Sequence, residues 1–573
     1  MRLIVVILAA ALVSSQAPAA DTVLTNGTVI TVDGRDSVAQ AVAIRDGKIV
    51  YVGTSAGARR FVGDKTDVID LHGRTATPGL IDTHVHFSEP ADNLELGDCR
   101  NMSEVIAKVK AWADRLKPGE WVRGRGWDEG KLAERRYILA SDLDKAAPNN
   151  PVYLTHTTGH YGVANSLALQ LSGVTKATKD PEGGTIDRDK DGNPTGVMKE
   201  RATSLIRTGA GAVTTTPAGG RNTMRDDVLR IIQGFNREGM TGAKDLNISQ
   251  AKWDLYKQLL EEGKLNVRMF ALWRGGSTIQ QTQQAMASIA AAPKLPASLG
   301  NGRLMSGGVK LYIDGSGGAR TAWMYDDWNK ELTGTDTGNK GYPANGDAYP
   351  EVFKQQVKML TAAGIHIGTH AVGDKGIDWV VDTYAEALKA SPIKGLRHSI
   401  IHANLPTDHA IAVMADLQKN YDAAYPEAQA PFLWWIGDTY AANFGAKRNQ
   451  RLEPFKSYEK AGVIWAGGSD YSVTPYEARY GLWASVERET QAGAYGKKPF
   501  GMTESVSIHT ALKSYTIWAA HQMFLDTQVG SLEVGKDADI AVWDKNMYAI
   551  PSAQLKDLKC ELTMVAGTVV FKK

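Results

Sequence analysis

The chain has 573 residues, which is more than one ordinary domain holds, so a large domain with a smaller partner is expected. Hydrophobic residues make up 43% and charged residues 22%, a composition typical of a soluble globular protein with ample material for a core. The formal net charge is +2, from 65 basic and 63 acidic side chains, and this balance gives no electrostatic reason to expect a nucleic-acid partner.

The first twenty residues have the three parts of a secretory signal peptide. A charged start at Arg2 is followed by an apolar run from Leu3 to Val13, and residues 17–19 (Ala-Pro-Ala) supply a small-x-small cleavage site. The run is too short to act as a membrane anchor, and no later segment approaches ~18 consecutive apolar residues. A buried N-terminal helix is the alternative. We expect residues 1–20 to be removed and the protein to be exported, to a bacterial periplasm, without a stable membrane anchor.

Two cysteines, Cys99 and Cys560, are present. An exported protein of this size that depended on disulfides would use more of them. We therefore expect two unpaired buried thiols, with a single bridge as the alternative. Neither cysteine has the spacing of a thiolate metal site.

Both ends of the chain are rich in short β segments. Residues 21–31, 41–52 and 67–70 are strand-like, and Asn26-Gly27 and Asp46-Gly47 supply turns between strands. Residues 540–543 and 562–571 have the same character near the C-terminus. We expect residues 21–76 and 519–573 to form one small composite β-sandwich domain.

The middle of the chain, residues 77–518, alternates apolar strands with amphipathic helices. This pattern predicts an α/β fold of the (β/α)8 TIM-barrel type, in which active-site groups lie at the C-terminal strand ends. The stretch from about 89 to 238 is too long for one connection and indicates an inserted subdomain. The eight expected strands are residues 79–86, 151–156, 239–245, 307–314, 364–370, 396–402, 421–425 and 462–470.

Candidate metal ligands stand at the ends of these strands. His84 and His86 end the first strand at a spacing of two, so both side chains point to the same side. Twelve histidines in 573 residues produce such a pair by chance about a quarter of the time, so the pair alone is weak. His370, His402 and Asp470 end three later strands. Lone histidines are usually core residues, but five such coincidences favour a metal site at the barrel mouth.

Lys310 is a charged residue inside the apolar strand 307–314. An unpaired buried ammonium is costly, so such a lysine is expected to be neutral or chemically used. A neutral lysine amine can take up carbon dioxide to form a carbamate with two oxygen ligands. The alternatives are a lysine that reaches the barrel rim or one that pairs with Asp245.

The sequence resembles the amidohydrolase superfamily, in the branch that includes N-substituted formamide deformylases. The matching segments span nearly the whole mature chain. They are TPGLIDTHVH (77–86), GVKLYIDGSGGARTA (308–322), THAVGD (369–374), IIHAN (400–404), GGSDYSV (467–473) and GSLEVGKDADIAVWD (530–544).

The resemblance implies a centre of two divalent metal ions. His84, His86 and Asp470 would hold one ion, His370 and His402 the other, and a carbamate on Lys310 would bridge them. Zinc suits these ligands, with manganese, iron or nickel as alternatives. Relatives usually have a glutamate immediately before the sixth-strand histidine, where this chain has Ile401. His366 and His398 lie at even spacing from the expected ligands and are easily mistaken for them.

These ligands imply hydrolysis of a carbonyl compound by a metal-bound hydroxide, with Asp470 as the catalytic proton shuttle. Three further residues are candidates for contact with a small-molecule substrate. His160, in a Gly-His…Asn motif, would bond to the substrate carbonyl, or is structural. Arg320 would bind a carboxylate, or lies in an ion pair, and Trp127 would form part of an aromatic wall or of the core.

The leading functional hypothesis is cleavage of a non-peptide C–N (amide) bond of a small molecule. A lactone, ester or carbamate hydrolase with the same metals is the first alternative. A non-catalytic periplasmic binding protein is the second. Relatives are often dimers, so a homodimer is a further expectation from the resemblance.

Overall fold

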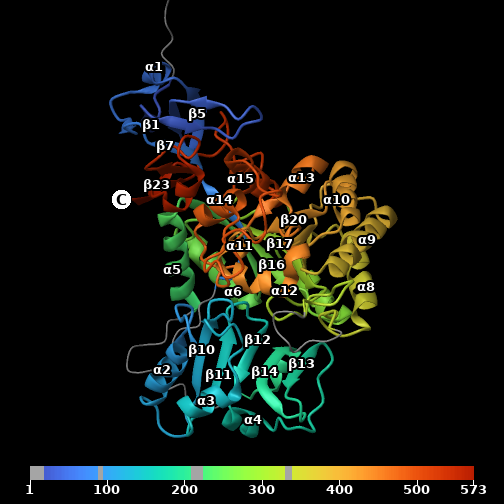
Figure 1. Ribbon diagram of the computed structural model, residues 1–573. Helices are drawn as coiled ribbons and strands as arrows, with labels where there is room; N and C mark the ends of the chain where they lie inside the picture. Colours follow the sequence, from blue (N-terminus) through green and yellow to red (C-terminus); the bar gives the residue numbers. More distant parts are fainter. Residues whose placement is uncertain (1–17, 88–93, 208–223, 330–338) are drawn as a thin grey trace, which may run out of the picture.

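The computed structural model describes residues 18–87, 94–207, 224–329 and 339–573. Its three parts lie in a row, with a β domain at one end, a barrel in the middle and an inserted subdomain at the other end (Figure 1). The predicted signal peptide, except for residues 18–20, lies outside the described residues. Within the described ranges, no helix has the length and apolar character that crossing a membrane requires.

A barrel of eight parallel strands forms the centre of the molecule, as predicted. Strands pair in sequence order, and the segment after the eighth strand bridges to the first. There, the Asp470 amide donates to the His84 carbonyl and the His86 amide donates to the Tyr471 carbonyl, both at 2.7 Å. The strands are β8 (Leu80–Val85), β15 (Met240–Ile248), β16 (Arg268–Arg274), β17 (Leu304–Tyr312), β18 (Ile367–Ala371), β19 (Ser399–His402), β20 (Tyr425–Ala428) and β21 (Ala466–Gly467).

One barrel strand differs from the prediction. Residues 151–156, expected to be the second strand, form β11 (Val152–His156) of a separate sheet. The second position belongs to β15, which was expected to be the third strand, and the strand that the prediction missed is β16, whose residues are all buried except Arg274. Because both faces of β16 are covered, its sequence RMFALWR shows no alternation, and a short apolar run of this kind cannot be identified as a strand by periodicity.

Helices follow the strands around the outside of the barrel (Figure 1). Several begin at a side-chain cap: Ser249, Thr278 and Thr407 each accept a hydrogen bond from the backbone amide three residues later. The barrel helices are α5 (Met224–Arg237), α6 (Gln250–Glu261), α7 (Ile279–Ala290), α8 (Tyr349–Ala362), α9 (Asp374–Ala390), α10 (Asp408–Tyr421), α11 (Pro431–Trp435), α12 (Gly437–Asn449), α13 (Phe455–Ala461), α14 (Ala478–Glu487), α15 (Ile508–Ser514) and α16 (Ile517–Gln522).

The inserted subdomain follows β8 in the chain and has its own six-stranded sheet, in the order β13-β14-β12-β11-β10-β9. The subdomain falls within the predicted range of about 89–238. However, α5, at the end of this range, packs on β15 and β23 and so belongs to the barrel side. Its further elements are β9 (Leu94–Glu95), α2 (Met102–Ala113), β10 (Val122–Trp127), α3 (Ala140–Ala146), β12 (Tyr161–Ala164), α4 (Ser166–Ser172), β13 (Gly184–Arg188), β14 (Pro194–Glu200) and η2 (Arg201–Leu205).

Both termini build the β domain, in which two sheets enclose a shared apolar core. Leu24 and Val42 of one sheet pack in one cluster with Ile540 and Leu562 of the other. The sheets are β5-β4-β1-β6 and β24-β23-β22-β7-β2-β3. Their strands are β1 (Thr22–Thr25), β2 (Thr28–Ile30), β3 (Val38–Ala39), β4 (Ala41–Arg45), β5 (Lys48–Gly53), β6 (Asp67–Asp70), β7 (Thr75–Pro78), β22 (Ile540–Trp543), β23 (Cys560–Val565) and β24 (Thr568–Lys572), joined by the short helices α1 (Ser55–Ala58), η1 (Arg59–Phe61) and η3 (Ser552–Asp557). The expected boundary between residues 76 and 77 falls inside β7.

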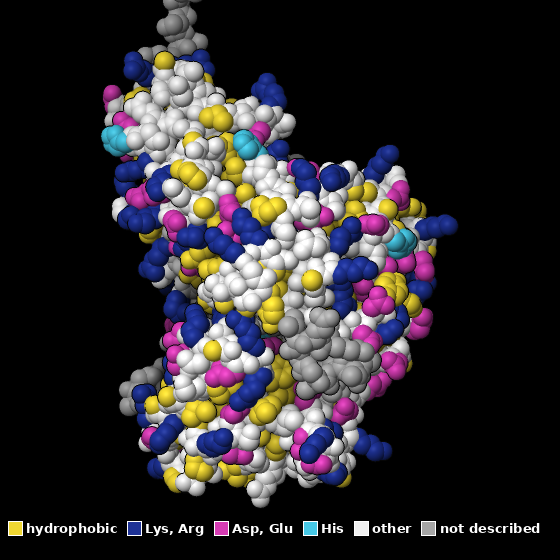
Figure 2. Space-filling view, viewed as in Figure 1, with side chains coloured by type: hydrophobic (Ala, Val, Ile, Leu, Met, Phe, Trp, Pro, Cys, Tyr) yellow, Lys and Arg dark blue, Asp and Glu magenta, His cyan; other side chains and the backbone are white. Residues whose placement is uncertain are grey.

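Cys99 and Cys560 are both buried and unpaired, as predicted. Basic and acidic side chains are interspersed over the face that Figure 2 shows, in keeping with the balanced charge.

The floor of the barrel holds a buried ion pair below the expected ligands. Lys244 of β15 pairs with Glu427 of β20, and the lysine also lies 3.3 Å from Nε2 of His366. His398 bonds to the Thr361 hydroxyl at 3.1 Å. His366 and His398, which share strand faces with the expected ligands, therefore have structural partners.

Candidate active site

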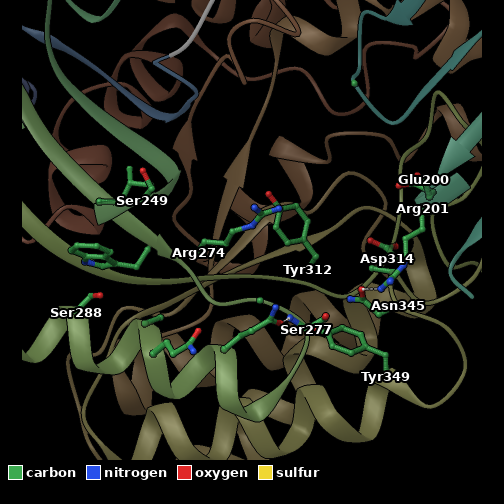
Figure 3. A pocket seen from close by; sticks show the side chains of 18 of the residues that line it. Glu200, Arg201, Ser249, Arg274, Ser277, Ser288, Tyr312, Asp314, Asn345 and Tyr349 are labelled. Atoms are coloured by element: carbon green, nitrogen blue, oxygen red, sulfur yellow. Dashed lines mark hydrogen bonds between the residues drawn. The ribbon is translucent and has the colours of Figure 1, made fainter. Parts of the chain in front are cut away.

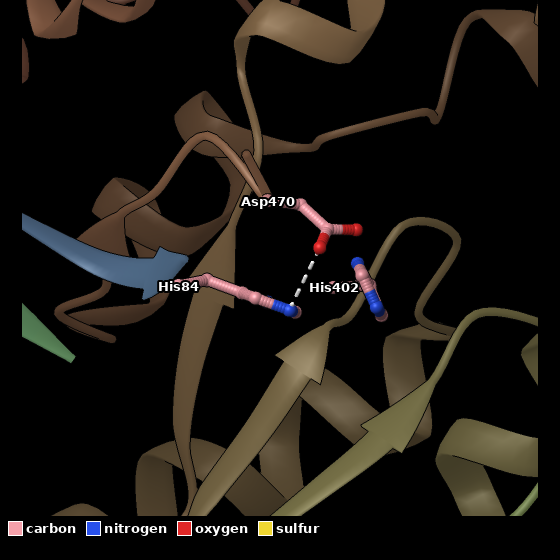
Figure 4. A group of neighbouring side chains, drawn as sticks. All are labelled: His84, His402 and Asp470. Carbon is pink, nitrogen blue, oxygen red and sulfur yellow. Dashed lines mark ion pairs between the residues drawn. The ribbon is translucent and has the colours of Figure 1, made fainter. Parts of the chain in front are cut away.

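His84, His86 and Asp470 meet at the point where the barrel closes. The period of two in β8 and its extension points both imidazoles the same way, and the loop after β21 brings the carboxylate to them. Oδ1 of Asp470 lies 3.1 Å from Nε2 of His84 and 3.2 Å from Nε2 of His86 (Figure 4 shows the His84 contact). Asp470 has a left-handed backbone, with φ of 54°, a rare conformation for residues other than glycine. Three potential ligand atoms therefore converge on one point.

His370 and His402 face each other at the ends of β18 and β19. Nε2 of His370 donates to the carbonyl of Gly315 at 2.8 Å, and Nδ1 of His402 donates to Oε1 of Gln429 at 2.6 Å. Each ring therefore keeps its lone pair on the other nitrogen. These two atoms, Nδ1 of His370 and Nε2 of His402, are 3.0 Å apart.

This arrangement fits a metal ion. Burial lowers the pKa of His370 and of His402 well below the usual value, and the neighbouring positive groups lower it further. A proton on either of the two facing nitrogens is therefore disfavoured. Without that proton the two nitrogens cannot form a hydrogen bond with each other. Two imidazole nitrogens on one tetrahedral ion with bonds of about 2.0 Å lie about 3.3 Å apart. The donor set and its spacing are thus those of a site for a divalent cation.

His84 and Asp470 are also held in the protonation states that a metal site requires. It lowers the pKa of His84 to about 3, so this ring is neutral at neutral pH. Burial raises the pKa of Asp470, but His84 and His86 outweigh it and hold that pKa well below the usual value. Metal ligands must be deprotonated, and both groups meet this condition.

Lys310 is buried in β17 and lines the same cavity as the other expected ligands. Burial lowers its pKa to about 7. None of the carboxylates in the described residues lies within ion-pair distance of its ammonium, and Asp245 is instead bonded to Lys252 at 2.7 Å. Both structural alternatives for this lysine, exposure at the rim and pairing with Asp245, are therefore excluded.

A cavity of about 370 Å³ brings the six expected ligands together at the C-terminal ends of the barrel strands. It is also lined by His160 and Tyr312. His160 comes from the inserted subdomain, and its Nδ1 lies 3.0 Å from both carboxylate oxygens of Glu200. Burial lowers the pKa of His160, but the Glu200 carboxylate outweighs burial and raises it.

The other two residues expected at the substrate lie elsewhere. Arg320 is buried and donates to the Tyr137 hydroxyl at 2.8 Å, and it lines neither this cavity nor the larger one beside it. Trp127 is fully buried in the core of the inserted subdomain, where its indole N–H donates to the Leu154 carbonyl at 3.1 Å. Neither side chain reaches the cavity.

Gln429 is a site residue that the sequence interpretation missed. Besides accepting from His402, its amide nitrogen donates to the Glu427 carbonyl at 2.7 Å and lies 3.3 Å from Nδ1 of His84. The available signal was its spacing of two from Glu427 at the end of a strand. Partners of this kind orient metal-binding imidazoles.

We expect Gln429→Leu to weaken metal binding by about 10- to 100-fold, because His402 loses the acceptor that fixes its tautomer and ring orientation. Competition with a chelator measures the change. Gln418→Leu is the control, since among the described residues the Gln418 side chain bonds to backbone groups of Ala424 and Ile464, away from the candidate ligands. Equal metal affinity in the wild type and Gln429→Leu would contradict the orienting role.

A second buried group, Asp128, Glu129 and His156, also has ligand-like spacing. However, the backbone amide of Thr158 donates to Nδ1 of His156 at 3.1 Å, so the proton of a neutral ring is on Nε2. That nitrogen lies 3.2 Å from the Glu129 carboxylate, an ion-pair contact when the ring is protonated. The Tyr161 hydroxyl donates to Glu129 at 2.8–2.9 Å and the Thr439 hydroxyl donates to Asp128, so both carboxylates already have partners within the protein.

Known proteins of similar sequence or structure were then compared with the chain. The model of a family described as the amidohydrolase family matches residues 67–571. N-substituted formamide deformylase from Arthrobacter pascens is 28% identical over 569 residues, which cover 96% of this chain and 98% of that protein. Protein LONG AFTER FAR-RED 3 from Arabidopsis thaliana is 29% identical over 549 residues, which cover 92% and 88%. An uncharacterized metal-dependent hydrolase from Pyrococcus horikoshii OT3 shares the fold, with a TM-score of 0.66, 23% identity and coverage of 93% and 99%.

Proposed function

Because this chain belongs to the amidohydrolase family and is a metal-dependent hydrolase, we propose that it cleaves a non-peptide C–N bond, the amide of a small molecule. The observation that carries the proposal is the pair of imidazole lone pairs 3.0 Å apart, His370 Nδ1 and His402 Nε2, beside a second group of ligands. The relative from Arthrobacter pascens, a formamide deformylase by name, supports the choice of an amide.

In this proposal His84, His86 and Asp470 hold one ion, and His370 and His402 hold a second. Lys310, as its carbamate, would be a ligand to both ions, because it lines the same cavity and lacks an ion pair in the described structure. When bound, two divalent ions, with zinc favoured by these ligands, would supply Lewis acidity and lower the pKa of water to near neutrality.

Asp470 is the residue that moves protons. Its Oδ1 faces the two histidines, whereas its Oδ2 has no hydrogen-bond partner among the described residues. Oδ2 can therefore accept a proton from water as the water oxygen bonds to the carbonyl carbon. The same proton then passes to the leaving nitrogen as the C–N bond breaks, which yields a carboxylic acid and an amine; proton transfer between them gives the carboxylate and the ammonium ion.

His160 is placed to bind the substrate carbonyl. Since the Glu200 carboxylate occupies Nδ1 and raises the pKa of the ring, the protonated ring carries a hydrogen on Nε2 that can be donated to the carbonyl oxygen. This contact would polarise the carbonyl and orient it toward Asp470.

The proposal is tested with a panel of N-formyl and N-acyl amines, cyclic amides, lactones and carbamates. We expect amide hydrolysis that disappears after chelation and returns when zinc or manganese is added, with liberated amine as the measured product. Amide hydrolysis that survives complete metal removal would contradict the metal mechanism. Turnover of lactones or carbamates alone would contradict the assignment to amides.

A further inference from the structure

A second and larger cavity, of about 750 Å³, adjoins the expected metal site. The two cavities share Gly159, His160 and Tyr312 in their walls. The larger one extends over the C-terminal ends of β15, β16 and β17, beneath η2 of the inserted subdomain, and Figure 3 shows Arg274 and Tyr312 among its side chains. A substrate whose amide is at the ligands would extend into this space.

The negative charges of this cavity are already engaged. Glu200 binds His160 and accepts from the Thr321 hydroxyl. Asp314 accepts from the backbone amides of Trp323, Val372 and Gly373 at 2.8–3.0 Å. Neither carboxylate is therefore left to recognise a cationic substrate.

Two arginines line the cavity, and the side chain of one of them, Arg274, has no hydrogen-bond or ion-pair partner among the described residues. Arg201 donates to the Asn345 side chain at 3.1 Å. The Arg274 side chain is exposed to the cavity, and it forms neither an ion pair nor a hydrogen bond with any residue that the structure describes. A guanidinium offers five N–H donors in a planar fork that matches a carboxylate.

Strand register places Arg274 next to the metal site. Phe270 and Leu272 belong to the apolar cluster inside the barrel, so Arg274, two residues further on, lies on the same inward face of β16. Arg274 is also the register partner of Lys310 on β17. Paired residues on neighbouring strands are about 4.8 Å apart. The Arg274 side chain therefore starts one strand away from Lys310, the expected bridging ligand.

We propose that Arg274 binds a carboxylate on the amine part of the substrate, which makes the substrate class N-acyl or N-formyl amino acids. This inference rests on the proposed amide hydrolysis. The short distance from Lys310 favours a carboxylate carbon two bonds from the scissile nitrogen, as in an α-amino acid, and the remaining volume accommodates the amino acid side chain.

The test compares two substrates that differ only in the carboxylate, N-formylphenylalanine and N-formylphenethylamine. We expect the wild type to favour the carboxylate substrate in kcat/KM by about 30-fold, the range of a charge-assisted bidentate contact. In Arg274→Met the ratio falls to near one, and Arg274→Lys lies between because a point charge replaces the fork. Arg201→Met, the matched control in the same cavity, keeps the ratio of the wild type.

The outcomes separate this inference from the proposed function. If the wild type hydrolyses both amides equally, or Arg274→Met keeps the preference, the carboxylate role is wrong while amide hydrolysis stands. If the wild type hydrolyses neither, the proposed function fails, and calorimetric binding of N-formylphenylalanine decides the inference. Binding that is lost in Arg274→Met but not in Arg201→Met supports it, and equal or absent binding overturns it.

Discussion

Asp470→Asn is expected to lower kcat by about 1,000-fold while the fold is retained. Proton transfer by a positioned side chain typically contributes 10²- to 10⁴-fold, and an amide cannot accept the proton that Oδ2 takes from water. The Asp470 carboxylate, which lies 3.1 Å from His84 and 3.2 Å from His86, would also balance the positive charge of an ion bound there. The variant should therefore hold the first ion less tightly. Single-turnover kinetics and metal analysis measure the two effects separately.

Asp382→Asn is the control for loss of a carboxylate as such, because Asp382 is on the surface and pairs with His409 at 2.8 Å. The melting temperature and the circular dichroism of Asp470→Asn should match those of the wild type. Undiminished kcat in a fully metal-loaded Asp470→Asn enzyme would rule out its role as proton shuttle.

Lys310→Met is expected to reduce the metal content from two ions per chain to one, with a fall in kcat of at least about 100-fold. Loss of even an outer partner of a metal ligand costs 10- to 100-fold, and Lys310 is proposed as a shared ligand itself. In the metal-free protein stability should not fall, since the substitution removes a buried amine that has no ion pair in the described structure. The metal content is measured by mass spectrometry. Mass spectrometry of the intact chain measures the carbon dioxide that the carbamate adds.

Lys244→Met is the matched control, a second buried lysine in the same barrel. Unlike Lys310, Lys244 forms an ion pair, with the buried Glu427 carboxylate. Its replacement should lower the free energy of unfolding by about 3–5 kcal/mol through an unpaired buried charge. Two ions bound to Lys310→Met would show that the lysine does not bridge them.

Local patterns in the sequence were enough to identify most of the site. The period of two in His84-x-His86 and the polar residues that end apolar strands at His370, His402 and Asp470 are properties of single strands. In the structure these residues line one cavity with Lys310. The barrel and the composite β domain likewise followed from patterns within each segment.

The third barrel strand, β16, could not be identified in this way. Both β11 and β16 are short and largely buried, and either sequence fits a barrel position. Which of them pairs with β15 depends on contacts between segments far apart in the chain. The sequence therefore predicts Arg320 as the carboxylate-binding residue, whereas Arg274, which lines the larger cavity, lies on the strand that the sequence does not identify.

The sequence by itself determined the class of fold, the family resemblance and the candidate ligand residues, because strand periodicity and burial are encoded locally. The tertiary structure alone decided which nitrogen of each imidazole is free, through Gly315 for His370 and Gln429 for His402, the first of these partners being 55 residues distant. It also decided which arginine enters the cavity. Hydrogen-bond direction and side-chain access depend on groups that only folding brings together.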